Sequence, residues 1–157
     1  LICSWGEGEP VFNQEAWELY RKEDNPNATG NPGTGPGEFN LPHDVTVDSN
    51  NNVYIMDREN NRCQIFDTDG NFINQWEDVR GPNDAVIDDD EVMHIAEGIG
   101  SVLITTLEGE IIGRWGSRGQ APGNFRGFPH GIWIDNQKDI YISEVGTKKG
   151  LQKFTRV

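Results

Sequence analysis

The sequence predicts an all-β fold assembled from repeated four-stranded sheets, and two observations lead to this expectation. First, its 157 residues include 19 Gly and 8 Pro, which recur with Asn and Asp between short apolar runs instead of pooling in one tract. Such spacing is typical of many short strands joined by tight turns. Second, one pattern of strands occurs three times along the chain. A repeat of this kind indicates similar units packed side by side.

Each repeat begins with an apolar strand that a proline opens and an aspartate closes. The three copies of this strand are residues 42–48, 82–88 and 129–135. A second strand follows in each copy and ends in an acidic residue fifteen positions after the proline; these residues are Asp57, Glu97 and Glu144. Asn, Asp, Ser, Gln, Glu and Lys fill the turns between the two strands, as expected where strands end. Each repeat is therefore expected to begin with a β-hairpin.

A third and a fourth strand complete the predicted sheets. The third strands are residues 63–66, 102–105 and 151–154, and the fourth strands of the first two repeats end in Trp76 and Trp115. Strands that are apolar on both faces fit a sheet packed between neighbouring sheets, as the blades of a β-propeller are. We therefore expect a single β-propeller segment over residues 1–157.

The expected segments follow from these strands. They are an outer strand at 1–6, which matches residues 111–116, an insertion at 7–33, blades at 34–77 and 78–116, and a three-stranded blade at 117–157. The strands add up to three blades, whereas a propeller needs roughly four to eight to close. Two interpretations stay open: two chains complete a six-bladed ring as a homodimer, or the chain is a fragment of a six-bladed propeller.

The antiparallel order of the strands places several polar residues on one rim of the blades. This rim carries the start of each first strand and the end of each second strand. Its candidate ligand-binding residues are His43, His130, Asn83, Asp57, Arg58, Glu97 and Glu144. The insertion emerges on the same rim, so its Tyr20 and Arg21 are candidates for a lid. The alternative for the insertion is a surface excursion or a subunit contact.

The segments 39–48, 53–57 and 61–66 resemble the NHL repeat closely. This resemblance covers nearly the whole chain except residues 7–33. Among NHL-like propellers the chain is similar to the peptidyl-hydroxyglycine amidating lyase. The segments that match it are 5–7, 36–39, 42–43, 57–60 and 129–130.

This resemblance implies a zinc ion, held by three rim histidines from alternate blades, that assists release of glyoxylate from a peptide end. His43 and His130 fall on positions equivalent to two of these ligands, whereas Asn83, a poor zinc ligand, would supply the third in a dimer. Gly131 stands where the family has a calcium-binding aspartate. The blades that carry the family's active-site Arg and Tyr have no counterpart here.

Two hypotheses for function follow. The first is a binding scaffold whose rim takes a protein, peptide or small-molecule ligand. The second is a zinc-dependent lyase or a related hydrolase that uses His43 and His130. The structural alternative is that both histidines only open inner strands and hydrogen-bond at the channel mouth. His94 lies in the middle of a strand, so we expect it to be a packing residue.

The acidic residues that end the second strands also allow two interpretations. Asp57, Glu97 and Glu144 line a cation-binding ring in the first. In the second, each accepts hydrogen bonds from backbone or arginine, with Arg62 as the partner of Asp57.

Charge and composition exclude some partners. The formal net charge of -13 makes binding to nucleic acid or an anionic bilayer unfavourable. The chain has no apolar run of the roughly 18 residues that a membrane span requires. Cys3 and Cys63 show no CxxC spacing, so we expect neither a disulfide framework nor a thiolate metal site.

Overall fold

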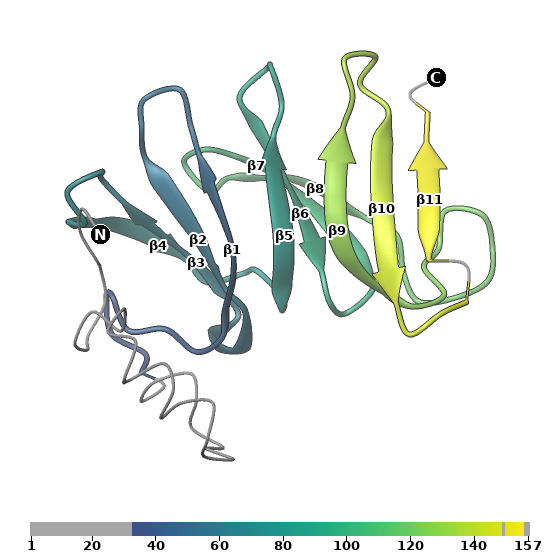
Figure 1. Ribbon diagram of the computed structural model, residues 1–157, viewed down its shortest axis with the longest axis horizontal. Coiled ribbons are helices and arrows are strands. Elements are labelled where there is room, and N and C mark those ends of the chain that lie inside the picture. Colours follow the sequence, from purple (N-terminus) through teal and green to yellow (C-terminus); the bar gives the residue numbers. More distant parts are fainter. Residues whose placement is uncertain (1–32, 149, 156–157) are drawn as a thin grey trace, which may run out of the picture.

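The computed structural model describes residues 33–148 and 150–155, which form three antiparallel sheets in a fan (Figure 1). Blade 1 consists of β1 (Pro42–Val47), β2 (Val53–Asp57), β3 (Arg62–Phe66) and β4 (Phe72–Trp76), with the 3-10 helix η1 (Arg58–Asn60) between β2 and β3. Blade 2 consists of β5 (Pro82–Ile87), β6 (Val92–Glu97), β7 (Ser101–Thr106) and β8 (Ile111–Trp115). Blade 3 consists of β9 (Phe128–Ile134), β10 (Ile140–Val145) and β11 (Leu151–Phe154).

The predicted all-β fold with three repeats is confirmed. Strands of each blade pair in chain order, and β1, β5 and β9 lie next to one another along the inner side of the fan (Figure 1). Residues 1–6, Tyr20, Arg21 and Cys3 lie outside the described residues, together with all of the insertion except its last residue. No helix in the described part of the chain is long and apolar enough to cross a membrane.

The repeated aspartate that closes the first strand organises the hairpin turn after it. Asp48 accepts hydrogen bonds through Oδ1 from the backbone N–H groups of Asn50 and Asn52, at 2.9 and 2.8 Å. Its Oδ2 accepts from the hydroxyl of Tyr54 at 3.1 Å. Asp88 and Asp135 hold the equivalent turns in the same way. Because this side chain satisfies the turn's backbone donors, an aspartate recurs at this position.

Apolar side chains fill the two junctions between blades. The core between blades 1 and 2 contains Tyr54, Met56, Cys63, Ile65, Trp76, Met93, Ile95 and Leu103. The core between blades 2 and 3 contains Ala96, Val102, Phe125, Ile132 and Ile142, with Trp115 packed against it. Each junction therefore buries one face of both blades, which explains why the strands are apolar on two sides.

Inner strands are also joined by aspartates that reach across the junctions. Asp44 Oδ2 accepts a hydrogen bond from the Ala85 backbone N–H at 2.9 Å, and Asp84 Oδ2 accepts one from the Ile132 N–H at 2.7 Å. Burial raises the pKa of Asp84, and the neighbouring carboxylate of Asp44 raises it further. Blade 3 has Gly131 at the equivalent position, so it cannot make the same bond to another blade.

Candidate functional site

The rim at the start of the inner strands brings three predicted residues together. The imidazole rings of His43 and His130 lie edge to face with their centroids 4.8 Å apart. His43 Nδ1 lies 2.6 Å from the carbonyl oxygen of Asn83, and the carbonyl can only accept, so Nδ1 carries the proton. The Nε2 lone pair of a neutral His43 is then available to a ligand.

Asn83 lies between the two histidines along the row of inner strands. Its Nδ2 donates to the carbonyl oxygen of Pro129 at 2.6 Å, which ties β5 to β9. Its Oδ1 is buried and accepts no hydrogen bond. A buried polar atom without a partner costs roughly 1–3 kcal/mol of stability. Three other such atoms, Trp76 Nε1, His94 Nδ1 and Thr105 Oγ1, lie among the described residues.

Next to His130 the rim is hollowed into a recess of about 250 Å³. Arg58 and Asn61, from the connection between β2 and β3, form one wall, and Phe128 and Val145 form an apolar wall. Asn61 adopts a left-handed conformation with φ 54°, and its Oδ1 accepts a hydrogen bond from the Gly81 N–H at 2.9 Å. The recess therefore combines the guanidinium group of Arg58, the Glu59 carboxylate 3.5 Å from it, amides and an imidazole with one apolar surface.

The three acidic residues that the sequence placed on the rim are buried inside their own blades. Asp57 and Glu97 are fully buried and Glu144 is nearly so. Asp57 binds Arg62 Nε at 2.7 Å, Glu97 binds Arg114 Nε at 2.9 Å, and Glu144 accepts from the Gly127 N–H at 2.7 Å. Each carboxylate holds a local loop or strand of its own blade. These contacts match the interpretation in which they accept structural hydrogen bonds.

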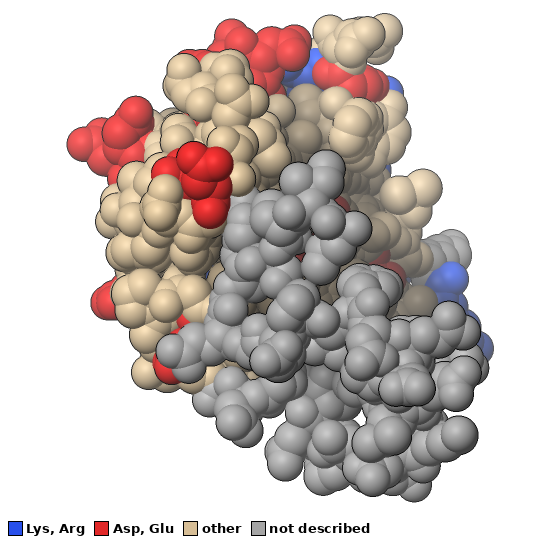
Figure 2. Space-filling view, turned by 60° about the vertical axis from the view of Figure 1, so that its left-hand side comes forward, with Lys and Arg blue, Asp and Glu red and all other residues tan. Residues whose placement is uncertain are grey.

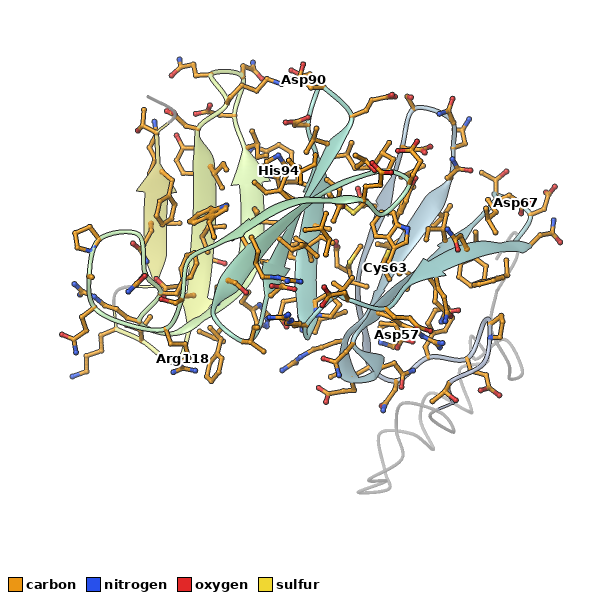
Figure 3. All side chains as sticks on the ribbon, turned by 180° about the vertical axis from the view of Figure 1, so that it is seen from behind. Asp57, Cys63, Asp67, Asp90, His94 and Arg118 are labelled. Atoms are coloured by element: carbon orange, nitrogen blue, oxygen red, sulfur yellow. The ribbon has the colours of Figure 1, made fainter. Side chains whose placement is uncertain are left out.

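His94 lies in the middle of β6, buried between blades 2 and 3 (Figure 3). Its Nε2 is 3.3 Å from Asp88 Oδ2, so it takes the place of the tyrosine hydroxyl found in blades 1 and 3. Burial lowers its pKa, although Asp88 opposes the shift. This location agrees with a packing role.

The described residues do not fit a three-histidine zinc site. In residues 33–148 and 150–155, no three His, Cys, Asp or Glu side chains come together as metal ligands. The rim supplies two imidazoles, and the positive charge of Arg58 is close enough to lower the pKa of His130. We therefore derive no zinc-dependent step.

Charge differs between the two rims. The turns on the rim opposite the histidines carry most of the exposed acid. These acidic residues include Asp67, Asp69, Asp89, Asp90, Glu91, Glu108 and Glu110. Figure 2 shows red side chains at the top of the molecule and also down its left side. In Figure 3, Asp67 and Asp90 lie at one end of the blades and Asp57 and Arg118 at the other. The histidine rim also carries Arg58, Arg80 and Arg126, so it is the less acidic side.

We expect Arg58 to tune the titration of His130. Burial lowers the pKa of His130, and the charges of His43 and Arg58 lower it further. Arg58→Gln should raise this pKa by a few tenths of a unit, as expected for the loss of one partly screened charge. NMR titration of the His130 Hε1 signal measures the shift, and His94 is the internal control. An unchanged His130 pKa would contradict the proximity of Arg58.

The sign of the effect on stability follows from the same shift. Because the folded pKa of His130 lies below the usual value, the unfolded chain binds this proton more tightly. The contribution of His130 to stability is therefore present above the unfolded pKa and is lost as pH falls through the folded pKa.

Sequence reasoning located His43, Asn83 and His130 but missed Phe128, Val145 and the recess. The recess forms where η1 meets the start of β9, which are about 70 residues apart in the chain. Only the packing of blade 1 beside blades 2 and 3 creates it. The signal that could have suggested it is the run of polar residues at 58–61, longer than a tight turn requires.

The geometry defines a segment of a β-propeller whose inner-strand rim carries a polar recess, and comparison with solved structures agrees. A streptogramin B lyase superposes with a TM-score of 0.58 at 14% identity over 80% of this chain and 43% of that one. Virginiamycin B lyase from Staphylococcus aureus, solved with quinupristin, superposes with a TM-score of 0.57 at 19% identity over 79% of this chain and 43% of that one. At these identities the likeness establishes the fold alone.

Comparison of the amino-acid sequence with known proteins finds matches to proteins that contain NHL repeats. Residues 39–66, which lie in blade 1, match the NHL repeat, so the chain contains an NHL repeat. It is 30% identical over 135 residues to human NHL repeat-containing protein 3, covering 80% of this chain but 38% of that protein. It is also 50% identical over 46 residues to Protein lin-41 of Caenorhabditis elegans, covering 29% of this chain and 4% of that protein. The chain thus spans well under half the length of these relatives.

Proposed function

We propose that this chain is a binding module that takes a polar ligand, as part of a protein, a peptide or a small molecule, at the histidine rim. The observation that carries the proposal is the convergence of His43, Asn83 and His130 from three consecutive inner strands. A rigid row of inner strands presents these groups with little conformational cost on binding. The adjacent recess offers Arg58 to hydrogen-bond acceptors and Phe128 to an apolar group.

Peptide pools provide the test of this proposal. Tripeptides with free carboxyl ends, titrated into the protein, should shift the NMR signals of His43 and His130 and leave that of His94 in place. Arg58→Gln should weaken the response about tenfold, as expected for one lost charged hydrogen bond. The matched control is Arg80→Gln, which removes an exposed arginine of the same rim that does not line the recess. Pools that shift no rim histidine, or shift it equally in both variants, would contradict the proposal.

The zinc-dependent lyase or hydrolase is the second proposal, and the observation behind it is the proximity of the His43 and His130 rings, whose centroids lie 4.8 Å apart. Two imidazoles hold zinc more weakly than the three protein ligands of a catalytic site. Chelator-stripped protein is titrated with zinc chloride in a calorimeter. One equivalent bound, and lost in both His43→Ala and His130→Ala, supports a metal site. No saturable binding, or binding that survives both changes, rejects it.

A further inference from the structure

Three exposed apolar side chains lie at the recess on the histidine rim. Phe128 begins β9 and Val145 ends β10, and the two residues pair directly across these strands. They are 42% and 45% exposed, and both line the recess. Ile99 is 50% exposed and follows Gly98, another lining residue, in the connection between β6 and β7. We call Ile99, Phe128 and Val145 the rim apolar patch, and described parts of the chain precede and follow each of them.

An arginine stacks on this patch. The guanidinium carbon of Arg118 lies 4.0 Å from the centroid of the Phe128 ring, the geometry of a cation–π contact. A guanidinium that stacks by its flat face keeps the N–H groups at its edge available to an acceptor. The arginine inside the recess differs, because Arg58 already lies 3.5 Å from the carboxylate of Glu59. Arg118 is therefore the better placed of the two to receive a carboxylate from a ligand.

The surrounding backbone holds Arg118 in place. On one side of it the Phe125 N–H donates to the Ser117 carbonyl, and on the other the Gly119 N–H donates to the Phe125 carbonyl, both at 2.9 Å. Phe125 itself is fully buried. The Arg118 side chain then lies against Gly100, where an added Cβ would be 2.6 Å from Arg118 Cγ. Because the guanidinium is positioned before a ligand arrives, less conformational entropy is lost on binding.

The charges around the patch favour an acidic partner. Arg118, Arg126 and Lys148 are exposed on this rim, and within residues 33–148 and 150–155 none of them forms an ion pair with a carboxylate. Asp78, an acid of the same rim, already pairs with Arg80 at 3.5 Å. Although the whole chain has a formal net charge of -13, this part of its surface therefore attracts negative charge.

We propose that the rim apolar patch and Arg118 bind a peptide segment of a partner protein in which an acidic residue adjoins a branched or aromatic one. The apolar side chain enters the recess of about 250 Å³ against Phe128 and Val145, and the adjacent carboxylate accepts hydrogen bonds from the edge of Arg118. Pockets for drug-sized ligands measure roughly 300–1,000 Å³, so this recess suits a single side chain. Because the same recess takes the ligand, this binding mode rests on the proposed function, and it adds Arg118 as the residue that selects the ligand.

Blocked tetrapeptides test the two contacts separately. The parent peptide is acetylated and amidated and has leucine followed by glutamate between two glycines. One analogue replaces the glutamate with glutamine, and the other replaces the leucine with alanine. NMR titration of the His130 Hε1 signal in the full chain gives the dissociation constants. Each analogue should bind about tenfold more weakly, because the first loses a charged hydrogen bond and the second loses buried methyl groups.

Substitutions in the protein assign each preference to a residue. Arg118→Gln should bind the glutamate and glutamine peptides equally, whereas Arg118→Lys, which keeps the charge, should retain most of the preference for glutamate. The matched control is Arg126→Gln, which removes another exposed, unpaired arginine of this rim. Phe128→Ala should remove the preference for leucine, and its control is Phe72→Ala, which is 39% exposed on β4. Circular dichroism verifies that each variant folds.

The possible failures are distinguishable. A preference for glutamate that survives Arg118→Gln would overturn this binding mode, as would single-stranded RNA that displaces the parent peptide. If all three peptides shift the His43 and His130 signals with equal affinity, the binding mode is wrong and the proposed function stands. If no peptide shifts either signal, both are wrong.

Discussion

Replacing Arg62 with methionine should lower the free energy of unfolding by roughly 3–5 kcal/mol, the usual cost of leaving a buried charge without its partner. Arg62 is 4% exposed and Asp57 is 0% exposed, and Arg62 Nε donates to Asp57 Oδ2 at 2.7 Å. Methionine fills similar volume but supplies no donor. The carboxylate would then stay buried with hydrogen bonds from the amides of Asn60 and Gln64 but without a counter-charge.

Arg62 also holds a segment outside the strands. Its guanidinium donates to the carbonyl oxygens of Gly35 and Glu38, at 3.0 and 2.7 Å, and so holds the segment before β1 against the sheet. Asp57 also accepts from the Asn40 N–H at 2.7 Å. The same pair therefore positions the chain that leads into His43.

Urea unfolding of the two proteins measures the effect. Arg58→Met is the matched control, because Arg58 pairs with Glu59 at 3.5 Å on the half-exposed surface. Exposed pairs contribute about 0–1 kcal/mol, so this change should move the midpoint little. If Arg62→Met costs less than about 1 kcal/mol, the buried pair is not the main link between β2, β3 and the segment before β1.

Local chemistry is what made the blades predictable from sequence. In each blade an aspartate binds the backbone of the turn that follows it; these residues are Asp48, Asp88 and Asp135. The contacts that require an aspartate there therefore join residues close together in the sequence. Trp76 and Trp115 fill similar wedges between blades, so their positions repeat too. Features that depend on contacts between residues close in sequence appear as the same residue at the same position of each repeat.

The site was predictable only in part, because its contacts are long-range. Antiparallel strand order placed His43 and His130 on one rim, but their 4.8 Å separation depends on how three blades pack. An acidic residue at the end of a strand fits either a ligand ring or a buried arginine pair. For Asp57 the sequence offered pairing with Arg62 as one of two interpretations, and the structure contains this ion pair at 2.7 Å.

The second large effect is expected for Gly116→Ala, which should destabilise the protein by roughly 2–5 kcal/mol. Gly116 follows Trp115 at the end of β8 and has φ +80°, a conformation that costs other residues roughly 1–2 kcal/mol. An added Cβ would lie 2.3 Å from Phe125 Cε2. Overpacking of this kind adds about 1–3 kcal/mol.

Gly123→Ala separates the two contributions. Gly123 has a similar φ of +84°, but its added Cβ would meet nothing within 4 Å, so only the backbone cost of about 1–2 kcal/mol applies. Phe125 packs against Trp115 and Phe154 at the junction of blades 2 and 3. Displacing it should also loosen β9, and with it His130. Equal unfolding midpoints for the two alanine variants would show that Phe125 moves aside at no cost, and that backbone conformation alone requires glycine here.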